Sequence, residues 1–137
     1  MAIVVDASVA VGWIVLTQAT PLTRAALAYV GGNEGWVPSN FAIEVARALR
    51  NQERRGLLTP DKVSAGIALL QAQAIKQDQT NAVARIDTVV GLARQYTLRV
   101  ADASYLELAI RLTLPLATKD AALARATGLA GIELFNP

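Results

Sequence analysis

Four carboxylates stand along this chain where folding could gather them for chemistry: Asp6, Glu44, Asp102 and Asp120. Asp6 and Asp120 each follow a short apolar run, at residues 3–5 and 114–117, that is typical of a buried strand. In a parallel sheet such strands end at one edge, where open α/β sheets bind their ligands. We therefore expect these two aspartates on the same side of the molecule.

Glu44 is expected on a helix face that is otherwise apolar. In the sequence FAIEVARAL the apolar residues Phe41, Val45 and Ala48 lie three or four apart, and Glu44 falls inside their stripe. A buried carboxylate is costly unless it is paired, neutralised or bound to a metal. The alternative is a salt bridge to Arg47, since helical residues at this spacing can pair.

The other polar residues near these acids have structural alternatives. Asp6 and Asp102 each precede an expected helix, and aspartate is a favoured helix cap. Ser8 and Thr118 each lie two residues from an aspartate and offer hydroxyls to a metal-bound water or a phosphate oxygen. The alternative for both hydroxyls is a local turn or cap bond.

A cluster of four carboxylates predicts a divalent cation, because the acids would otherwise repel each other strongly. The chain has no cysteine and no histidine, which excludes thiolate ligands, imidazole ligands and Ser-His-Asp triads. Oxygen ligands favour Mg²⁺ or Mn²⁺. Such an ion activates water and holds the oxygens of a phosphodiester. The carboxylates and the missing thiol and imidazole ligands therefore favour a hard divalent ion held by oxygen atoms.

The elements that must position these acids alternate between strands and helices. Strands are expected over 3–5, 36–37, 75–79, 114–117 and 132–135, and helices over 8–16, 21–30, 41–55, 60–74, 81–96, 103–112 and 121–127. Expected caps are Thr20, Ser39-Asn40, Thr59 and Thr80, and expected stops are Gly31-Gly32, Gly56 and Gly128. The pattern predicts one α/β domain over residues 1–137, a mainly parallel sheet of about four to five short strands wrapped by about seven helices.

The net charge and the N-terminal residues indicate which partners the protein contacts and where in the cell it lies. The net charge is +2, and most of the cations are arginines, which suit phosphate contacts. No basic segment precedes the first apolar residues, and the apolar run 9–16 is far shorter than the ~20 residues of a membrane helix. We expect a cytoplasmic protein with no membrane contact.

Four segments of the chain resemble the PIN-domain ribonucleases, specifically the VapC toxins of VapBC-type toxin–antitoxin pairs. They are VVDASVAVGW, FAIEVARALRNQERRG, ARQYTLRVADASYLELA and LPLATKDAALARATG, in family order and with family-like spacing over nearly the whole chain. The one departure is the polar segment IKQDQ, where family members carry a more apolar third strand.

The resemblance implies a Mg²⁺- or Mn²⁺-dependent endoribonuclease. Its catalytic and metal-binding acids would be Asp6, Glu44, Asp102 and Asp120, with Asp120 either a direct ligand or one step removed from the ion. Ser8 and Thr118 would support the site. The resemblance also implies a homodimer that is inhibited by a VapB-like antitoxin covering the acidic site. Apart from the resemblance, the helix over 59–75, with Val63, Ile67 and Leu70, is a candidate dimer surface.

Basic residues near the acids gain a role from this interpretation. Arg47, Arg50, Arg54 and Lys119 are predicted to steer RNA phosphates toward the metal. The alternative for each arginine is a solvated charged face.

Two other functions remain open at this point. One is a phosphohydrolase of the haloacid-dehalogenase kind, with Asp6 as nucleophile and Lys119 steadying the phosphoryl group, although such enzymes usually carry a second aspartate where this chain has Ser8. The other is an interaction module without turnover, whose acidic pocket receives an arginine from a partner.

Overall fold

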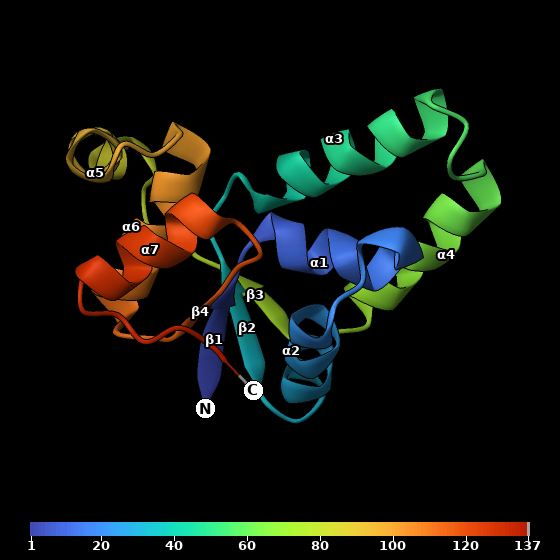
Figure 1. Cartoon of the computed structure of the whole chain (residues 1–137), viewed down its shortest axis with the longest axis horizontal. Helices are drawn as coiled ribbons and strands as arrows, with labels where there is room; N and C mark the ends of the chain where they lie inside the picture. Colours follow the sequence, from blue (N-terminus) through green and yellow to red (C-terminus); the bar gives the residue numbers. More distant parts are fainter. Residues whose placement is uncertain (137) are drawn as a thin grey trace.

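A four-stranded parallel sheet lies at the centre of the molecule, in the order β3-β2-β1-β4 (Figure 1). The computed structural model describes residues 1–136. The strands are β1 (Ala2–Val5), β2 (Glu34–Val37), β3 (Ile75–Gln77) and β4 (Leu116–Ala117). The central strand β1 is buried from Ile3 to Val5, as its run of β-branched residues predicts.

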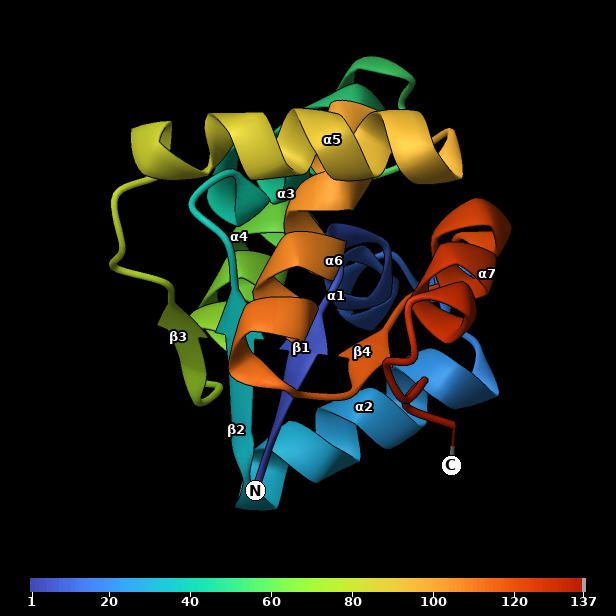
Figure 2. The same ribbon diagram turned by 90° about the vertical axis from the view of Figure 1, so that its left-hand side faces the viewer.

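Seven α-helices surround this sheet. They are α1 (Ala7–Ile14), α2 (Pro21–Gly32), α3 (Phe41–Arg54), α4 (Pro60–Gln71), α5 (Ile86–Tyr96), α6 (Val100–Leu112) and α7 (Ala121–Leu129), with short 3₁₀ turns at Leu16–Gln18 and Val83–Arg85. Helices α5, α6 and α7 lie on one side of the strands, and α1 to α4 extend on the other (Figures 1 and 2). The predicted fold class is confirmed. No helix among residues 1–136 is both long and apolar enough to cross a membrane.

The polar segment after α4 does form a strand. Residues Ile75–Gln77 pair with β2 as an edge strand, where one side of the backbone faces solvent and charged side chains are tolerated. Lys76 forms an ion pair with Glu34 and lies over the Trp36 ring. Arg111 of α6 binds Asp78, just beyond the strand, with Nη2 2.6 Å from Oδ2. Ion pairs therefore hold an edge that lacks the usual apolar side chains.

Two predicted helix starts were wrong, and in both cases the expected capping side chain has another partner. The helix expected from residue 81 begins at Ile86 after a 3₁₀ turn, and Thr80 does not cap it because its hydroxyl donates to Asp78 at 2.8 Å. Helix α6 begins at Val100, three residues earlier than expected, so Asp102 lies inside its first turn. The caps at Thr20 and Thr59 are confirmed.

The predicted helix ends were confirmed only in part. Gly56 follows α3 with a positive φ of 71°, whereas Gly31-Gly32 and Gly128 lie inside α2 and α7. Gly131, with φ 77°, follows the end of α7. Helices α1 and α4 end at Ile14 and Gln71, earlier than expected. The expected strand over 132–135 is only an isolated bridge between Leu134 and Leu116.

Helix α4 packs on α1 at a glycine. A Cβ on Gly66 would lie 2.1 Å from Ile14 Cγ2 and 3.0 Å from Ile14 Cβ. Because Ile14 is β-branched and stiff at χ1, it cannot move aside easily. The close approach of these helices therefore requires glycine at this position.

We predict that Gly66→Ala lowers the free energy of unfolding by about 1–3 kcal/mol through overpacking, despite the better helix propensity of alanine. The matched control is Gly31→Ala in α2, where nothing lies within 4 Å of the added Cβ, and there alanine should stabilise by up to about 1 kcal/mol. Urea unfolding measures both. Equal effects of the two substitutions would contradict the packing argument.

Candidate active site

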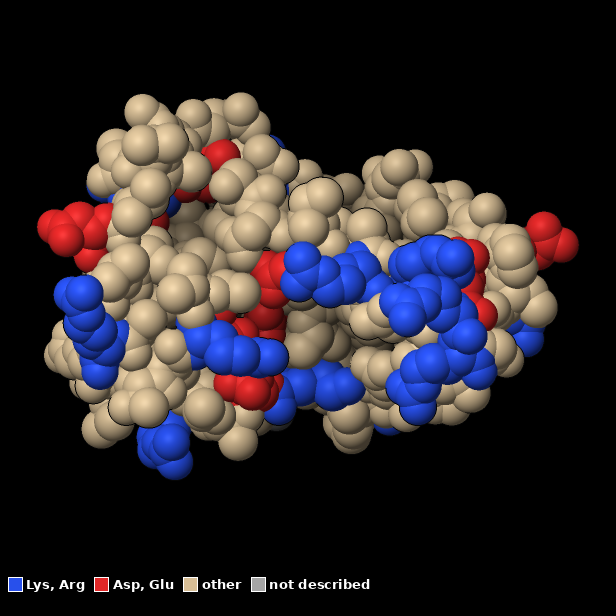
Figure 3. Space-filling view, turned by 90° about the horizontal axis from the view of Figure 1, so that it is seen from above, with Lys and Arg blue, Asp and Glu red and all other residues tan. Residues whose placement is uncertain are grey.

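All four sequence-predicted carboxylates line a single cavity of about 290 Å³. Asp6 follows β1, Glu44 projects from α3, Asp102 lies in the first turn of α6, and Asp120 precedes α7. Ser8, Arg99 and Lys119 complete most of the wall. Figure 3 shows acidic side chains in a hollow with basic side chains around it. The carboxyl edge of the sheet therefore gathers the acids as expected, while their roles as catalytic residues or metal ligands stay predictions.

Asp6 is held by two hydroxyls rather than acting as a helix cap. It occupies the N-cap position of α1 but makes no side-chain cap bond. Ser8 Oγ and Thr118 Oγ1 each donate to its Oδ2 at 2.7 Å. Both hydroxyls in turn accept backbone N–H groups, from Lys119 at 3.2 Å and Asp120 at 3.0 Å. The local turn bonds proposed as alternatives for these hydroxyls are thus part of the bonding of Asp6.

Glu44 is half-buried and bound from two directions. Tyr105 donates its O–H to Glu44 Oε2 at 2.9 Å, and the Asn40 amide donates to the same oxygen. Ser104 Oγ lies 2.5 Å from the Ala101 carbonyl oxygen, to which it donates, and 3.1 Å from Asn40 Oδ1. The alternative salt bridge to Arg47 does not occur among the described residues, and the expected side-chain cap by Asn40 was wrong because Asn40 binds Glu44 instead.

Asp102 and Asp120 have different partners. Asp102 is buried and its Oδ2 lies 3.0 Å from Arg99 Nε, so it is neither a helix cap nor unpaired. Asp120 Oδ2 accepts the Leu123 N–H at 2.8 Å and caps α7. The capping interpretation therefore applies to the side chain of Asp120 but not to those of Asp6 and Asp102.

The acids influence one another electrostatically. Burial raises the pKa of Asp6, the charge of Asp102 raises it further, and the hydroxyls of Ser8 and Thr118 oppose the shift. Burial likewise raises the pKa of Glu44, with contributions from Asp6 and Asp102 against the bonds from Tyr105 and Asn40. Burial and Glu44 together raise the pKa of Tyr105, so its O–H stays a donor at neutral pH. Gathering these charges is unfavourable without a cation.

The donor set fits a hard divalent cation, although the side chains are not arranged as ligands. Within residues 1–136, no three acidic side chains form a group that could hold one ion as they stand. Each carboxylate is bound to its own partner: Asp6 to hydroxyls, Glu44 to Tyr105, Asp102 to Arg99. The groups of the cavity that can bind a metal nevertheless all bind through oxygen, which suits Mg²⁺ or Mn²⁺ better than softer ions. A divalent cation would also offset the repulsion between the carboxylates.

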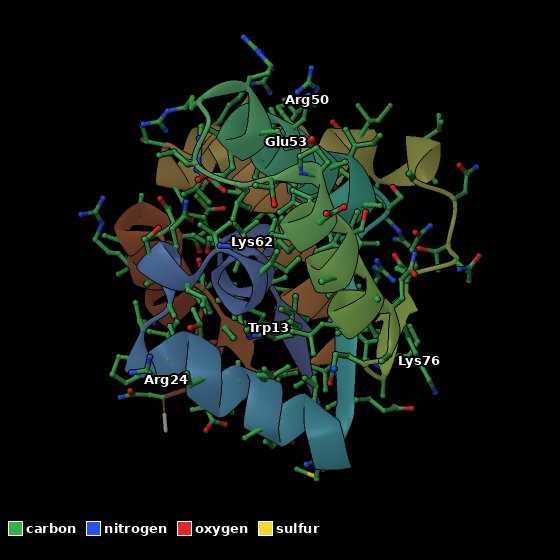
Figure 4. The ribbon with its side chains drawn as sticks, turned by 90° about the vertical axis from the view of Figure 1, so that its right-hand side faces the viewer. Trp13, Arg24, Arg50, Glu53, Lys62 and Lys76 are labelled. Atoms are coloured by element: carbon green, nitrogen blue, oxygen red, sulfur yellow. The ribbon has the colours of Figure 1, made fainter. Side chains whose placement is uncertain are left out.

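The predicted RNA-contacting residues do not all reach the cavity. Arg47, Arg50 and Arg54 are exposed on α3 and outside its lining, and Figure 4 shows Arg50 pointing outward from that helix. Lys119 lines the cavity, but its Nζ donates to the Gln18 carbonyl at 2.7 Å.

Three residues of the site escaped sequence reasoning: Arg99, Tyr105 and Asn40. Asn40 was identified only as a cap and Tyr105 carried no polar pattern of its own. One signal for Arg99 was available, because it stands three residues before Asp102, a spacing at which helical side chains can pair.

The model of the PIN domain family matches residues 3–129 of this chain. The chain belongs to the PIN-domain family. The domain also resembles the crystal structure of PAE2754 from Pyrobaculum aerophilum, with a TM-score of 0.67 and 21% sequence identity over 92% of this chain and 79% of that one. At this identity the likeness shows a common fold. No curated protein sequence matches the chain significantly. PIN domains are typically nucleases and generally use divalent metals.

Two buried acids of this PIN domain should respond oppositely to neutralisation. Because the folded-state pKa of Asp6 lies above its ordinary 3.8, its contribution to stability is present below pH 3.8 and is lost as the pH rises through the raised value. We therefore predict that Asp6→Asn stabilises the metal-free protein at neutral pH, and that this gain shrinks as the pH is lowered toward 3.8.

The matched control is Glu107→Gln. Glu107 is also buried, but Arg111 Nε binds it at 2.9 Å, so its neutralisation should destabilise the fold at neutral pH. Urea unfolding in EDTA at several pH values measures both variants. Comparable destabilisation by Asp6→Asn and Glu107→Gln would contradict the prediction, because it would show that the charge of Asp6 stabilises the fold.

Proposed function

We propose that this PIN domain is a divalent-metal-dependent endoribonuclease and the toxin of a toxin–antitoxin pair. The observation that supports it most is the meeting of four carboxylates, from elements far apart in the sequence, in one cavity of a domain whose family is typically nucleolytic.

In this proposal Asp6, Glu44 and Asp102 hold a Mg²⁺ or Mn²⁺ ion. Asp120, which already caps α7, contributes directly or through water. When bound, the ion supplies a reactive water and neutralises charge on the phosphodiester. Ser8 and Thr118 keep the Asp6 carboxylate in place, and Tyr105 with Asn40 does the same for Glu44.

The basic face of α3 provides the approach for RNA in this proposal. Arg47, Arg50 and Arg54 are exposed along the helix that carries Glu44, and Figure 3 shows a group of basic side chains over the far end of that helix. Such a group attracts a polyanion without contacting the reacting atoms.

We predict that Asp6→Asn and Glu44→Gln each lower Mn²⁺-dependent RNA cleavage by about 100-fold or more, because each removes a charge that would stabilise the reacting centre. Glu53→Gln is the matched control: Glu53 lies on the same helix as Glu44 and outside the cavity. Cleavage of labelled single-stranded and structured RNAs is followed on gels. Full activity in both cavity variants would refute the proposed site.

The phosphohydrolase alternative has little support from the geometry. The Lys119 ammonium binds the Gln18 carbonyl rather than facing Asp6, and Ser8 donates to Asp6 where a second acid would be needed. The interaction module without turnover would be favoured by wild-type protein that binds Mn²⁺ yet cleaves none of these RNAs.

A toxin of a toxin–antitoxin pair stops cell growth unless its antitoxin binds it. We predict that induced expression of the wild-type chain in the cytoplasm arrests growth, that Asp6→Asn abolishes the arrest, and that co-expression of a VapB-like antitoxin encoded beside it relieves it. Growth curves and co-purification of the two proteins measure this. Equal toxicity of wild type and Asp6→Asn would contradict a nuclease toxin.

We also propose a homodimer formed through α5. This helix has no buried residue within the single chain, and Val83, Ile86 and Val100 around it are 72%, 57% and 58% exposed. The earlier candidate, α4, exposes less apolar surface, because Ile67 and Leu69 are 38% and 39% exposed and Val63 is buried. Ile86→Asp should convert a dimer into a folded monomer in sedimentation experiments, and wild-type protein that sediments as a monomer would exclude the dimer.

A further inference from the structure

Arg99 occupies a position where local stability does not call for arginine. It is the N-cap residue of α6 and makes no side-chain cap bond, whereas Ser, Thr, Asp or Asn would stabilise a helix start there. Its side chain forms an ion pair with Asp102. The Arg99 side chain is 79% exposed, and the Asp102 side chain is 8% exposed. An ion pair with so exposed a partner contributes little to folding.

The geometry of this pair leaves most of the guanidinium available. Nε is the only Arg99 nitrogen that hydrogen-bonds within residues 1–136. A guanidinium carries five N–H donors in a planar fork that matches phosphate oxygens. Its two terminal nitrogens therefore stay available at the mouth of the acidic cavity.

Arg99 is also the cation that is best placed to act on the cavity. Its side chain lines the cavity together with all four acids, and its Nε binds Asp102 at 3.0 Å. Lys119, the other basic lining residue, has its ammonium bound to a carbonyl. The arginines of α3 lie outside the lining.

A phosphodiester needs such a cation to enter this cavity. Four ionised carboxylates outweigh the two charges of a single divalent ion together with the one of Lys119. The remaining negative charge would repel RNA. A fixed arginine beside the ion offsets part of that charge and can donate to a phosphate oxygen.

We propose that Arg99 contacts an RNA phosphate at the cavity mouth and supplies positive charge beside a single divalent ion. This inference rests on the proposed nuclease function. Arg99 keeps Nε near Asp102 and turns its terminal nitrogens to the phosphate, so the pair with Asp102 aims the guanidinium.

The test compares Arg99→Ala, Arg99→Lys and Arg24→Ala. Arg24 is an exposed arginine on α2, placed at the opposite end of the molecule from Arg50 in Figure 4, and it controls for the loss of one positive charge. Three quantities are measured: cleavage of a labelled single-stranded RNA of mixed sequence, the salt dependence of its binding by fluorescence anisotropy, and Mn²⁺ binding by electron paramagnetic resonance.

Arg99→Ala should lower cleavage by about 10- to 100-fold, the range of a charge-assisted hydrogen bond. It should reduce the slope of log affinity against log salt by about 0.7, the value for one phosphate contact on a single strand. Mn²⁺ affinity should be retained or rise, because Asp102 is released from its ion pair. Arg99→Lys should recover the slope but only part of the cleavage, and Arg24→Ala should match the wild type.

Two results would overturn the proposal. An unchanged salt slope in Arg99→Ala would exclude a phosphate contact, and a loss of Mn²⁺ affinity in step with cleavage would show that Arg99 only positions Asp102. These outcomes differ from a failure of the nuclease function. If the wild type binds RNA and Mn²⁺ without cleaving, the nuclease proposal fails while the salt slopes still decide the role of Arg99.

Discussion

Two hydrogen bonds to one carboxylate oxygen hold the functional edge of this domain together. Ser8 and Thr118 both donate to Asp6 Oδ2, and through them the chain after β1 is joined to the chain after β4. The same hydroxyls accept backbone N–H groups of Lys119 and Asp120, and the Asp6 N–H bonds the Ala117 carbonyl at 3.0 Å, so these bonds together keep Asp120 close to Asp6. The remaining two acids are brought to this junction by α3 and α6.

The acids outside the cavity and those inside it have different kinds of partners. Glu107 and Asp78 share Arg111, which closes a compact ion cluster between α6 and the edge strand. The cavity acids have mainly neutral hydroxyl and amide partners, and burial together with mutual repulsion raises the pKa values of Asp6 and Glu44. An unfavourable arrangement of charge at a cavity is characteristic of functional sites.

Local sequence patterns predicted elements well where the deciding interactions are local. The β-branched run of β1 and the Thr-Pro starts of α2 and α4 depend on neighbouring residues, and they formed as expected. Thr80 and Asn40 look like caps in sequence, but their side chains bind Asp78 and Glu44 in the fold. The helix start predicted from Asn40 was nevertheless correct, whereas the one predicted from Thr80 was five residues too early. The edge strand β3 forms from polar residues because Lys76 and the residue that follows the strand, Asp78, find charged partners on other elements.

The sequence by itself determined which acids stand at strand ends and on the α3 face, and its lack of cysteine and histidine limited the chemistry to oxygen ligands. Only the tertiary structure decided how those acids are held. Tyr105 lies 61 residues from Glu44, and Thr118 lies 112 residues from Asp6. Residues so far apart in the sequence belong to no common turn or helix, so no local sequence pattern can predict that they bind each other. The contact of Arg99 with the cavity likewise follows from where α6 begins, which depends on packing as well as on the residues of its first turn.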